Sequence, residues 1–142
     1  MSRSNQYGRL RRRTSGRQFS GLLSGLLLVG CHGFRAEASV ASRTEGSSEL
    51  RPLSGASLSY DCPQVLKAPS RSFLGRTDAG GHLAVEEPAG GRWLHDGCTV
   101  HVEKAGFVEQ HYDVARVCTA YSGNHCLQID LLVLLRPIGS PG

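Results

Sequence analysis

The chain has 142 residues, of which 39% are hydrophobic and 20% charged, and its formal net charge at pH 7 is +4. Six of its 16 Lys and Arg residues precede Cys31, so the remainder carries ten basic against 12 acidic residues and has a net charge of −2. This balance excludes a nucleic-acid-binding module, which needs a clustered basic face. The length after the N-terminal segment allows one domain.

The N-terminal segment has the layout of a secretory signal peptide. Residues 1–20 contain arginines between Arg3 and Arg17 but no Asp or Glu, and the apolar run Gly21–Gly30 follows them. A basic region followed by a short apolar run is typical of such a peptide, with the basic end on the cytoplasmic side. The run is too short to span a bilayer, which takes about 20 apolar residues. We predict that residues 1–30 are a signal peptide.

The apolar run ends in Leu28-Val29-Gly30-Cys31, which resembles the lipobox of bacterial lipoprotein signal peptides. The resemblance implies cleavage before Cys31, a diacylglycerol on its sulfur and an acyl chain, with palmitate expected, on the new amino terminus. It also implies a membrane-anchored lipoprotein of the bacterial cell envelope, and His32 in place of Asp favours the outer membrane. The alternatives are an ordinary signal peptide that leaves Cys31 as a free thiol, and a short core helix that ends in Cys.

The cysteine count favours the lipid anchor. The chain has five cysteines, and lipidation of Cys31 leaves an even number for pairing in an oxidising compartment. Two acyl chains make a durable anchor, because each buried methylene contributes roughly 0.8 kcal/mol.

Residues 31–54 are predicted to be the lipidated cysteine and a flexible tether. They are rich in Ser, Ala, Glu and Arg and have no sustained apolar period at helix or strand spacing. A flexible chain of this length has a root-mean-square reach of roughly 25 Å, enough to hold a domain clear of the lipid headgroups.

From Gly55 onward, short alternating segments are separated by Gly and Pro signals, which predicts an all-β sandwich over residues 55–137 and a disordered tail over 138–142. The expected strands are Ala56–Cys62, Ser72–Arg76, His82–Glu86, Cys98–Glu103, Phe107–Val114 and Leu127–Arg136. In the last strand, Ile129, Leu131, Val133 and Leu135 are expected to face inward, with Gln128 and Asp130 outward. Leu132 and Leu134 break the outward polarity, so part of that face is expected to be covered.

Two turns carry specific signals. The segment 77–81 places Asp78 first and glycines where positive φ is needed. Lys104-Ala105-Gly106 fits a three-residue hairpin loop with Gly106 in the left-handed region. That loop would pair Val102 with Val108 and Cys98 with Tyr112. Val100, Val102 and Val108 would then share one face, and His101 would lie opposite Glu109 on the other.

These segments resemble the transthyretin-like, or carboxypeptidase regulatory-like, β-sandwich, a Greek-key-type fold. The motifs that carry the resemblance are residues 55–60, 75–83 and 98–107, followed by a final strand over 129–135. The usual first strand, before Gly55, is hard to see. The residues alone allow three pairings of Cys62, Cys98, Cys118 and Cys126. The topology implied by the resemblance pairs Cys62 with Cys98 and Cys118 with Cys126.

The sequence predicts no catalytic residues, no metal site and no cofactor. The spacing His95-x-x-Cys98-x-x-His101 could indicate a metal-binding motif, but in a strand Cys98 and His101 point to opposite faces. The carboxylates lie on different segments without a nucleophile motif, and the glycines form no phosphate loop because no helix follows them. His101, His111 and Glu109 are interpreted chiefly as polar residues on a solvated sheet face.

The resulting hypothesis is a lipid-anchored, non-catalytic interaction or structural module, bound to the membrane through Cys31 and to a protein partner or an envelope polymer. The alternative is a ligand-binding lipoprotein that recognises a carbohydrate or peptide through the loop around Trp93 or the face around His101. The competing role for Trp93, the single tryptophan, is to cap one end of the sandwich.

Overall fold

The computed structural model describes residues 33–44, 46–64, 68, 70–87 and 94–140. The predicted signal peptide and Cys31 lie outside these residues, as does Trp93. Within them, no helix is long and apolar enough to cross a membrane. The strands form two sheets that pack face to face, which confirms the predicted all-β sandwich.

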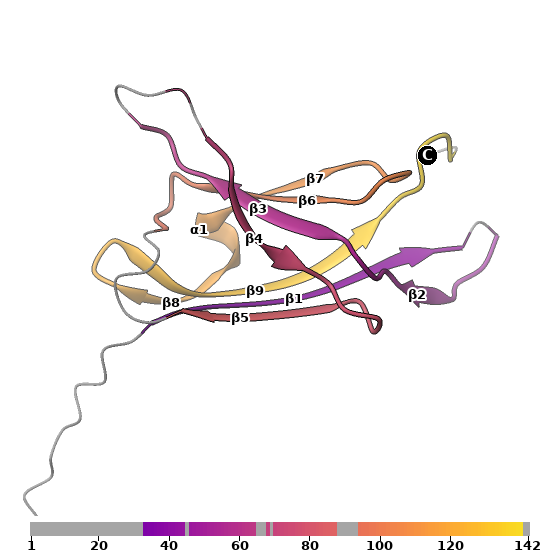
Figure 1. Cartoon of the computed structure of the whole chain (residues 1–142), viewed down its shortest axis with the longest axis horizontal. Helices are drawn as coiled ribbons and strands as arrows, with labels where there is room; N and C mark the ends of the chain where they lie inside the picture. Colours follow the sequence, from indigo (N-terminus) through magenta and orange to yellow (C-terminus); the bar gives the residue numbers. More distant parts are fainter. Residues whose placement is uncertain (1–32, 45, 65–67, 69, 88–93, 141–142) are drawn as a thin grey trace, which may run out of the picture.

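The five-stranded sheet is organised around β1 (Phe34–Arg43). On one side β1 pairs in parallel with β9 (His125–Leu135), which in turn pairs antiparallel with β8 (Cys118–Ser122). On its other side β1 pairs antiparallel with β5 (His82–Glu87) and, near its end, with β2 (Leu50–Pro52). Figure 1 shows β1 and β9 running together along the length of the molecule.

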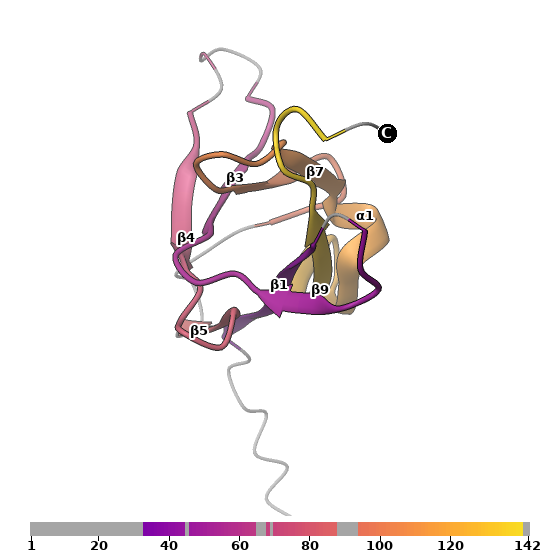
Figure 2. The ribbon, with the colours of Figure 1, turned by 90° about the vertical axis from the view of Figure 1, so that its right-hand side faces the viewer.

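The four-stranded sheet has the order β4-β3-β6-β7, with every neighbouring pair antiparallel. Its strands are β3 (Ser57–Asp61), β4 (Ser72–Arg76), β6 (Thr99–Glu103) and β7 (Gln110–Asp113). The short helix α1 (Val114–Val117) leads from β7 to β8 and so carries the chain from this sheet to the other. Figure 2 shows the two sheets as separate layers.

The core lies between the layers and consists of the inward side chains of both sheets. Its buried hydrophobic members are Phe34, Ala36, Ala38, Val40, Ala56, Leu58, Leu74, Leu94, Cys98, Val100, Val102, Val114, Cys126, Ile129, Leu131, Val133 and Leu135. The inward positions predicted for the last strand, from Ile129 to Leu135, are therefore confirmed. Alternate burial along β9 is what a strand with one covered face requires.

The prediction of a flexible tether over residues 31–54 is wrong for the residues that the structure describes. Phe34, Ala36, Ala38 and Val40 alternate inward along β1, and residues 50–52 form β2. The alternation was not evident in the sequence because the inward residues include two alanines, which have low strand propensity. Pairing on both sides, with β9 and β5, overrides that propensity. The sandwich therefore includes residues before Gly55, with β1 as a strand of the five-stranded sheet.

The six predicted strands occur, five of them with shifted ends. Ser72–Arg76 matches β4, and the other five correspond to β3, β5, β6, β7 and β9. β8 was not predicted, nor was the four-residue helix α1. The expected disordered tail is also wrong for its first residue, because Ile138 donates a backbone hydrogen bond of 2.9 Å to the Gly106 carbonyl.

The register predicted for the β6–β7 hairpin is wrong by two residues. Val102 pairs with Gln110 instead of Val108, and Tyr112 pairs with Val100 instead of Cys98. The turn itself forms, with Gly106 at φ +86°. The register differs because the chain after the turn pairs elsewhere: the Val108 N–H donates to the Arg136 carbonyl at 2.8 Å. Val108 consequently lies 41% exposed, outside the core.

The predicted turn at residues 77–81 is confirmed and links β4 of one sheet to β5 of the other. Asp78 Oδ1 accepts hydrogen bonds from the N–H groups of Gly80 and His82, each at 2.9 Å. Gly81 has φ +75°, and a Cβ at this position would lie 2.4 Å from the Val40 carbonyl oxygen. Both the backbone conformation and the close approach of β1 therefore require glycine.

Candidate functional site

A row of four residues crosses the outer face of the four-stranded sheet. Cross-strand pairing places Phe73 beside Ser59, Ser59 beside His101, and His101 beside His111. Val100 and Val102, on either side of His101 in β6, point into the core. The alternation of β6 thus directs His101 away from the core and into a group of polar side chains.

His101 is the centre of this group, which we call the His101 cluster: Asp61, His101, Glu109 and His111. The Nε2 atom of His101 lies 2.7 Å from Asp61 Oδ2. Its Nδ1 atom lies 2.8 Å from His111 Nδ1 and 3.2 Å from Glu109 Oε1. The two imidazole rings meet edge to face, with centroids 4.8 Å apart.

Within the His101 cluster, neighbouring side chains bury His101, while His111 at the edge of the sheet stays exposed. His101 is only 6% exposed, whereas His111, on the edge strand β7, is exposed. Arg71 Nη1 lies 3.0 Å from Glu109 Oε1 and 3.7 Å from Glu103 Oε2. The sequence prediction that His101, His111 and Glu109 gather on one hairpin is therefore confirmed, but the prediction that this face is solvated is wrong at His101.

Asp61 was missed as a member of this cluster by the sequence analysis. It lies on β3, 40 residues before His101, and the pairing of β3 with β6 brings the two together. A possible signal was the polar alternation Ser57, Ser59, Asp61 along β3, which puts Asp61 on the outward face.

A second group of possible metal ligands consists of Cys62, His95 and Cys98. Cys62 and Cys98 form a disulfide, so neither sulfur is available as a thiolate. His95, Cys98 and His101 also do not form one metal site, because the His101 side chain lies in the other group of possible ligands. The His95 N–H instead donates to the Cys98 sulfur at 3.3 Å.

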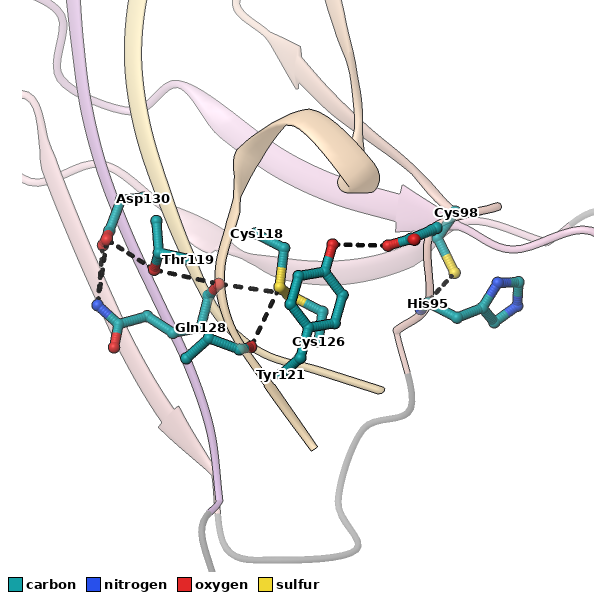
Figure 3. The surroundings of a disulfide bond; sticks show 10 residues. His95, Cys98, Cys118, Thr119, Tyr121, Cys126, Gln128 and Asp130 are labelled. Carbon is teal, nitrogen blue, oxygen red and sulfur yellow. Dashed lines mark hydrogen bonds between the residues drawn. A yellow bond between two sulfur atoms is a disulfide. The ribbon is translucent and has the colours of Figure 1, made fainter. Parts of the chain in front are cut away.

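The other predicted disulfide, Cys118–Cys126, joins β8 to β9, so both predicted pairings occur. Figure 3 shows the side chains around it. The Tyr121 hydroxyl donates a 2.6 Å hydrogen bond to Asp96 Oδ1, and this bond raises the pKa of Tyr121. The Cys126 N–H donates to the Leu94 carbonyl at 2.8 Å. These contacts hold residues 94–98 against the β8–β9 hairpin.

The outer face of the five-stranded sheet contains an open hollow of about 540 Å³. Polar residues of β1, β5 and β9 line it, including Glu37, His82 and Asp130, together with Leu132. Leu132 is 86% exposed and Leu134 is 41% exposed. The expected cover of part of this face is therefore not found over Leu132 within the described part of the chain.

Comparisons with known proteins show a weak structural likeness. No protein-family model and no curated protein matches the sequence. Among solved structures, the crystal structure of the major plantain pollen allergen Pla l 1 is 16% identical and has a TM-score of 0.47. The match covers 78% of this chain and 98% of that chain.

Proposed function

We propose that the protein is a lipid-anchored lipoprotein of the bacterial cell envelope, attached through Cys31. The observation that carries the proposal is the pairing of the four later cysteines in two disulfides. Disulfides persist in compartments outside the cytoplasm, which agrees with an N-terminal export signal. The four later cysteines pair with one another, so an acyl chain on Cys31, at the end of the lipobox-like segment, would leave none of them without a partner.

Because β1 begins at Phe34, the lipid on Cys31 would be only a few residues from the sandwich. Phe34 is the third residue after Cys31, and three extended residues span about 10 Å. The anchor therefore holds the sandwich close to the lipid headgroups, not on a long tether. The end nearest the membrane is the one where β1 begins, and the β8–β9 hairpin lies at that same end because Arg35 pairs with Gln128 (Figure 1).

A direct test is metabolic labelling with a tagged fatty acid, followed by intact-mass measurement. The native protein should begin at Cys31, carry acyl chains and fractionate with the outer membrane. Cys31→Ala should be unlabelled, His32→Ser should behave as the native protein, and His32→Asp should move toward the inner membrane. An unlabelled native chain that begins at Met1 would refute the proposal.

For the sandwich itself we propose a non-catalytic interaction or structural role, with a protein or an envelope polymer as the partner. The support is the outer face of the five-stranded sheet, where Leu132 and Leu134 stand exposed beside the open hollow. A pair of exposed leucines among polar neighbours suits contact with a partner better than contact with water.

Affinity capture from detergent-solubilised envelopes tests this role. Leu132→Asp should abolish capture of the partner, while Phe73→Asp should not. Phe73 is a suitable control because it is 56% exposed and lies on the other sheet. Equal capture of the partner by both variants would show that the partner does not bind through the outer face of the five-stranded sheet.

The second candidate is ligand binding at the His101 cluster, with a carbohydrate or a peptide as the ligand. The observation that favours it is the convergence of two imidazoles and two carboxylates on the open edge of the four-stranded sheet. Binding to glycan and peptide arrays that is lost in His111→Ala and kept in Leu132→Asp would support this candidate over the first.

A further inference from the structure

The strongest unassigned feature is the convergence of three donor atoms in the His101 cluster. One nitrogen each of His101 and His111 and one oxygen of Glu109 all lie within 4.8 Å of one another. His101 and His111 are cross-strand partners on β6 and β7, and Glu109 immediately precedes β7. The donors thus come from one hairpin, which holds them in place without a ligand.

The protons of the cluster cannot satisfy all of these contacts at once. The Asp61 carboxylate only accepts hydrogen bonds, so His101 Nε2 carries a hydrogen toward it. If His101 is neutral, its bare Nδ1 faces another acceptor, Glu109 Oε1, at 3.2 Å. If His101 is charged, its one Nδ1 proton faces both Glu109 Oε1 and His111 Nδ1, and it can be donated along a straight line to only one of them.

The Glu109 Oε1 oxygen also lacks a hydrogen-bond donor in the described part of the chain. Oε1 is buried and accepts no hydrogen bond from the residues that the structure describes, although Arg71 Nη1 lies 3.0 Å away. A cation placed between the two nitrogens and this oxygen would satisfy all three atoms together, which a proton cannot do.

The contact between Asp61 and His101 orients the first ligand. A carboxylate that accepts the N–H of a histidine fixes its tautomer and directs the other nitrogen at a metal, and this arrangement accompanies most histidine metal ligands. Here the Nε2 contact of 2.7 Å leaves Nδ1 pointing at Glu109 and His111. Three carboxylates, Asp61, Glu103 and Glu109, against one guanidinium, Arg71, make the surroundings favourable to a dication.

We propose that His101, Glu109 and His111 bind one divalent transition-metal cation of the Zn²⁺ or Cu²⁺ class. Two imidazole nitrogens and one carboxylate oxygen suit these ions better than Ca²⁺ or Mg²⁺, which take oxygen ligands. Metal bonds of about 2.0–2.1 Å place tetrahedral ligands roughly 3.3 Å apart. The 2.8 Å separation of the two nitrogens must therefore widen slightly, and the exposed His111 on an edge strand can provide that shift. Three ligands leave a further position open to water or to a second ligand.

This inference goes beyond the proposed function and does not depend on the lipid anchor. The test uses the protein as it is purified from cells, with its disulfides formed, stripped with a chelator and dialysed against ZnCl₂. One equivalent of Zn²⁺ per chain should bind. Glu109→Gln and His111→Ala should each weaken binding at least about tenfold, and the positioning variant Asp61→Asn should do so by about tenfold. All three changes are at partly or fully exposed positions, and circular dichroism should show that the variants fold.

His95→Ala is the matched control, since His95 belongs to the other candidate group, and it should bind Zn²⁺ as the native protein does. With CuCl₂ as the probe, electron paramagnetic resonance should show coupling to two imidazole nitrogens in the native protein and to one in His111→Ala. Absence of stoichiometric binding would overturn the proposal. So would native affinity in a folded His111→Ala, or a loss of binding in His95→Ala equal to that in His111→Ala.

Discussion

The two sheets of this sandwich share one core but differ in their outer faces. The four-stranded sheet buries His101 among carboxylates, while the five-stranded sheet leaves Leu132 open to solvent. Buried polar groups need partners, so the first face depends on a specific arrangement of side chains. An exposed leucine has no polar group that needs a hydrogen-bond partner, so the second face can contact another molecule without breaking a hydrogen bond. The difference separates the proposed metal site on one face from the proposed contact surface on the other.

Each sheet also has its own disulfide, and removing them one at a time gives the largest expected losses of stability. Cys62–Cys98 closes a loop of 36 residues and Cys118–Cys126 a loop of 8. In the chain-entropy account these loops correspond to about 4 and about 2.5 kcal/mol. Double replacement by Ala should lower the free energy of unfolding in that order, as measured by urea denaturation. The reverse order would mean that native-state contacts outweigh loop entropy.

The outer faces should respond differently to truncation. His101→Ala should lower the free energy of unfolding by about 1–3 kcal/mol, because it leaves the Asp61 carboxylate without its hydrogen bond to the buried imidazole. Leu132→Ala should change the free energy of unfolding by less than about 0.5 kcal/mol, because its side chain is 86% exposed. Urea denaturation of both variants measures the contrast, and equal costs would contradict the structural difference between the faces.

The connection between the two sheets depends on hydrogen bonds made by Thr77. The Thr77 hydroxyl donates to the Leu53 carbonyl at 2.6 Å and accepts from the Ala56 N–H at 2.9 Å. Thr77→Val keeps the shape but leaves both backbone groups unpaired, so we expect a loss of about 1–3 kcal/mol in unfolding free energy. Thr119→Val is the control, since Thr119 is exposed on β8. A neutral Thr77→Val would show that the hydroxyl does not hold the connection.

The smallest effects concern two tyrosines, one on each sheet. Burial raises the pKa of Tyr112 on β7, and the hydrogen bond to Asp96 raises the pKa of Tyr121 on β8. A raised pKa favours the protonated folded state, so this stability is present below about pH 10 and is lost as pH rises through the folded pKa. In Asp96→Asn, an ultraviolet titration should show the Tyr121 pKa falling toward its ordinary value. The Tyr112 pKa should not change, and a shift of both would disprove separate causes.

The candidate site was only partly visible in the sequence. The hairpin signal at Gly106 brought His101, Glu109 and His111 to one face even though the register was wrong by two, because a shift of two residues keeps the side-chain face. Asp61 and Arg71 could not be placed, since they come from β3 and from the segment before β4. The burial of His101 could not be predicted from the sequence either, because side chains of neighbouring strands cover it.

The sequence by itself determined the all-β class, the inward face of β9 and the turn from Thr77 to Gly81. Each of these depends on residues close together in the chain, whose alternation or backbone preference acts locally. Tertiary structure alone decided that β1 is a central strand, that Val108 pairs with Arg136 and that Asp61 meets His101. These outcomes depend on partners far away in the chain, and no local pattern records which distant strand will supply them.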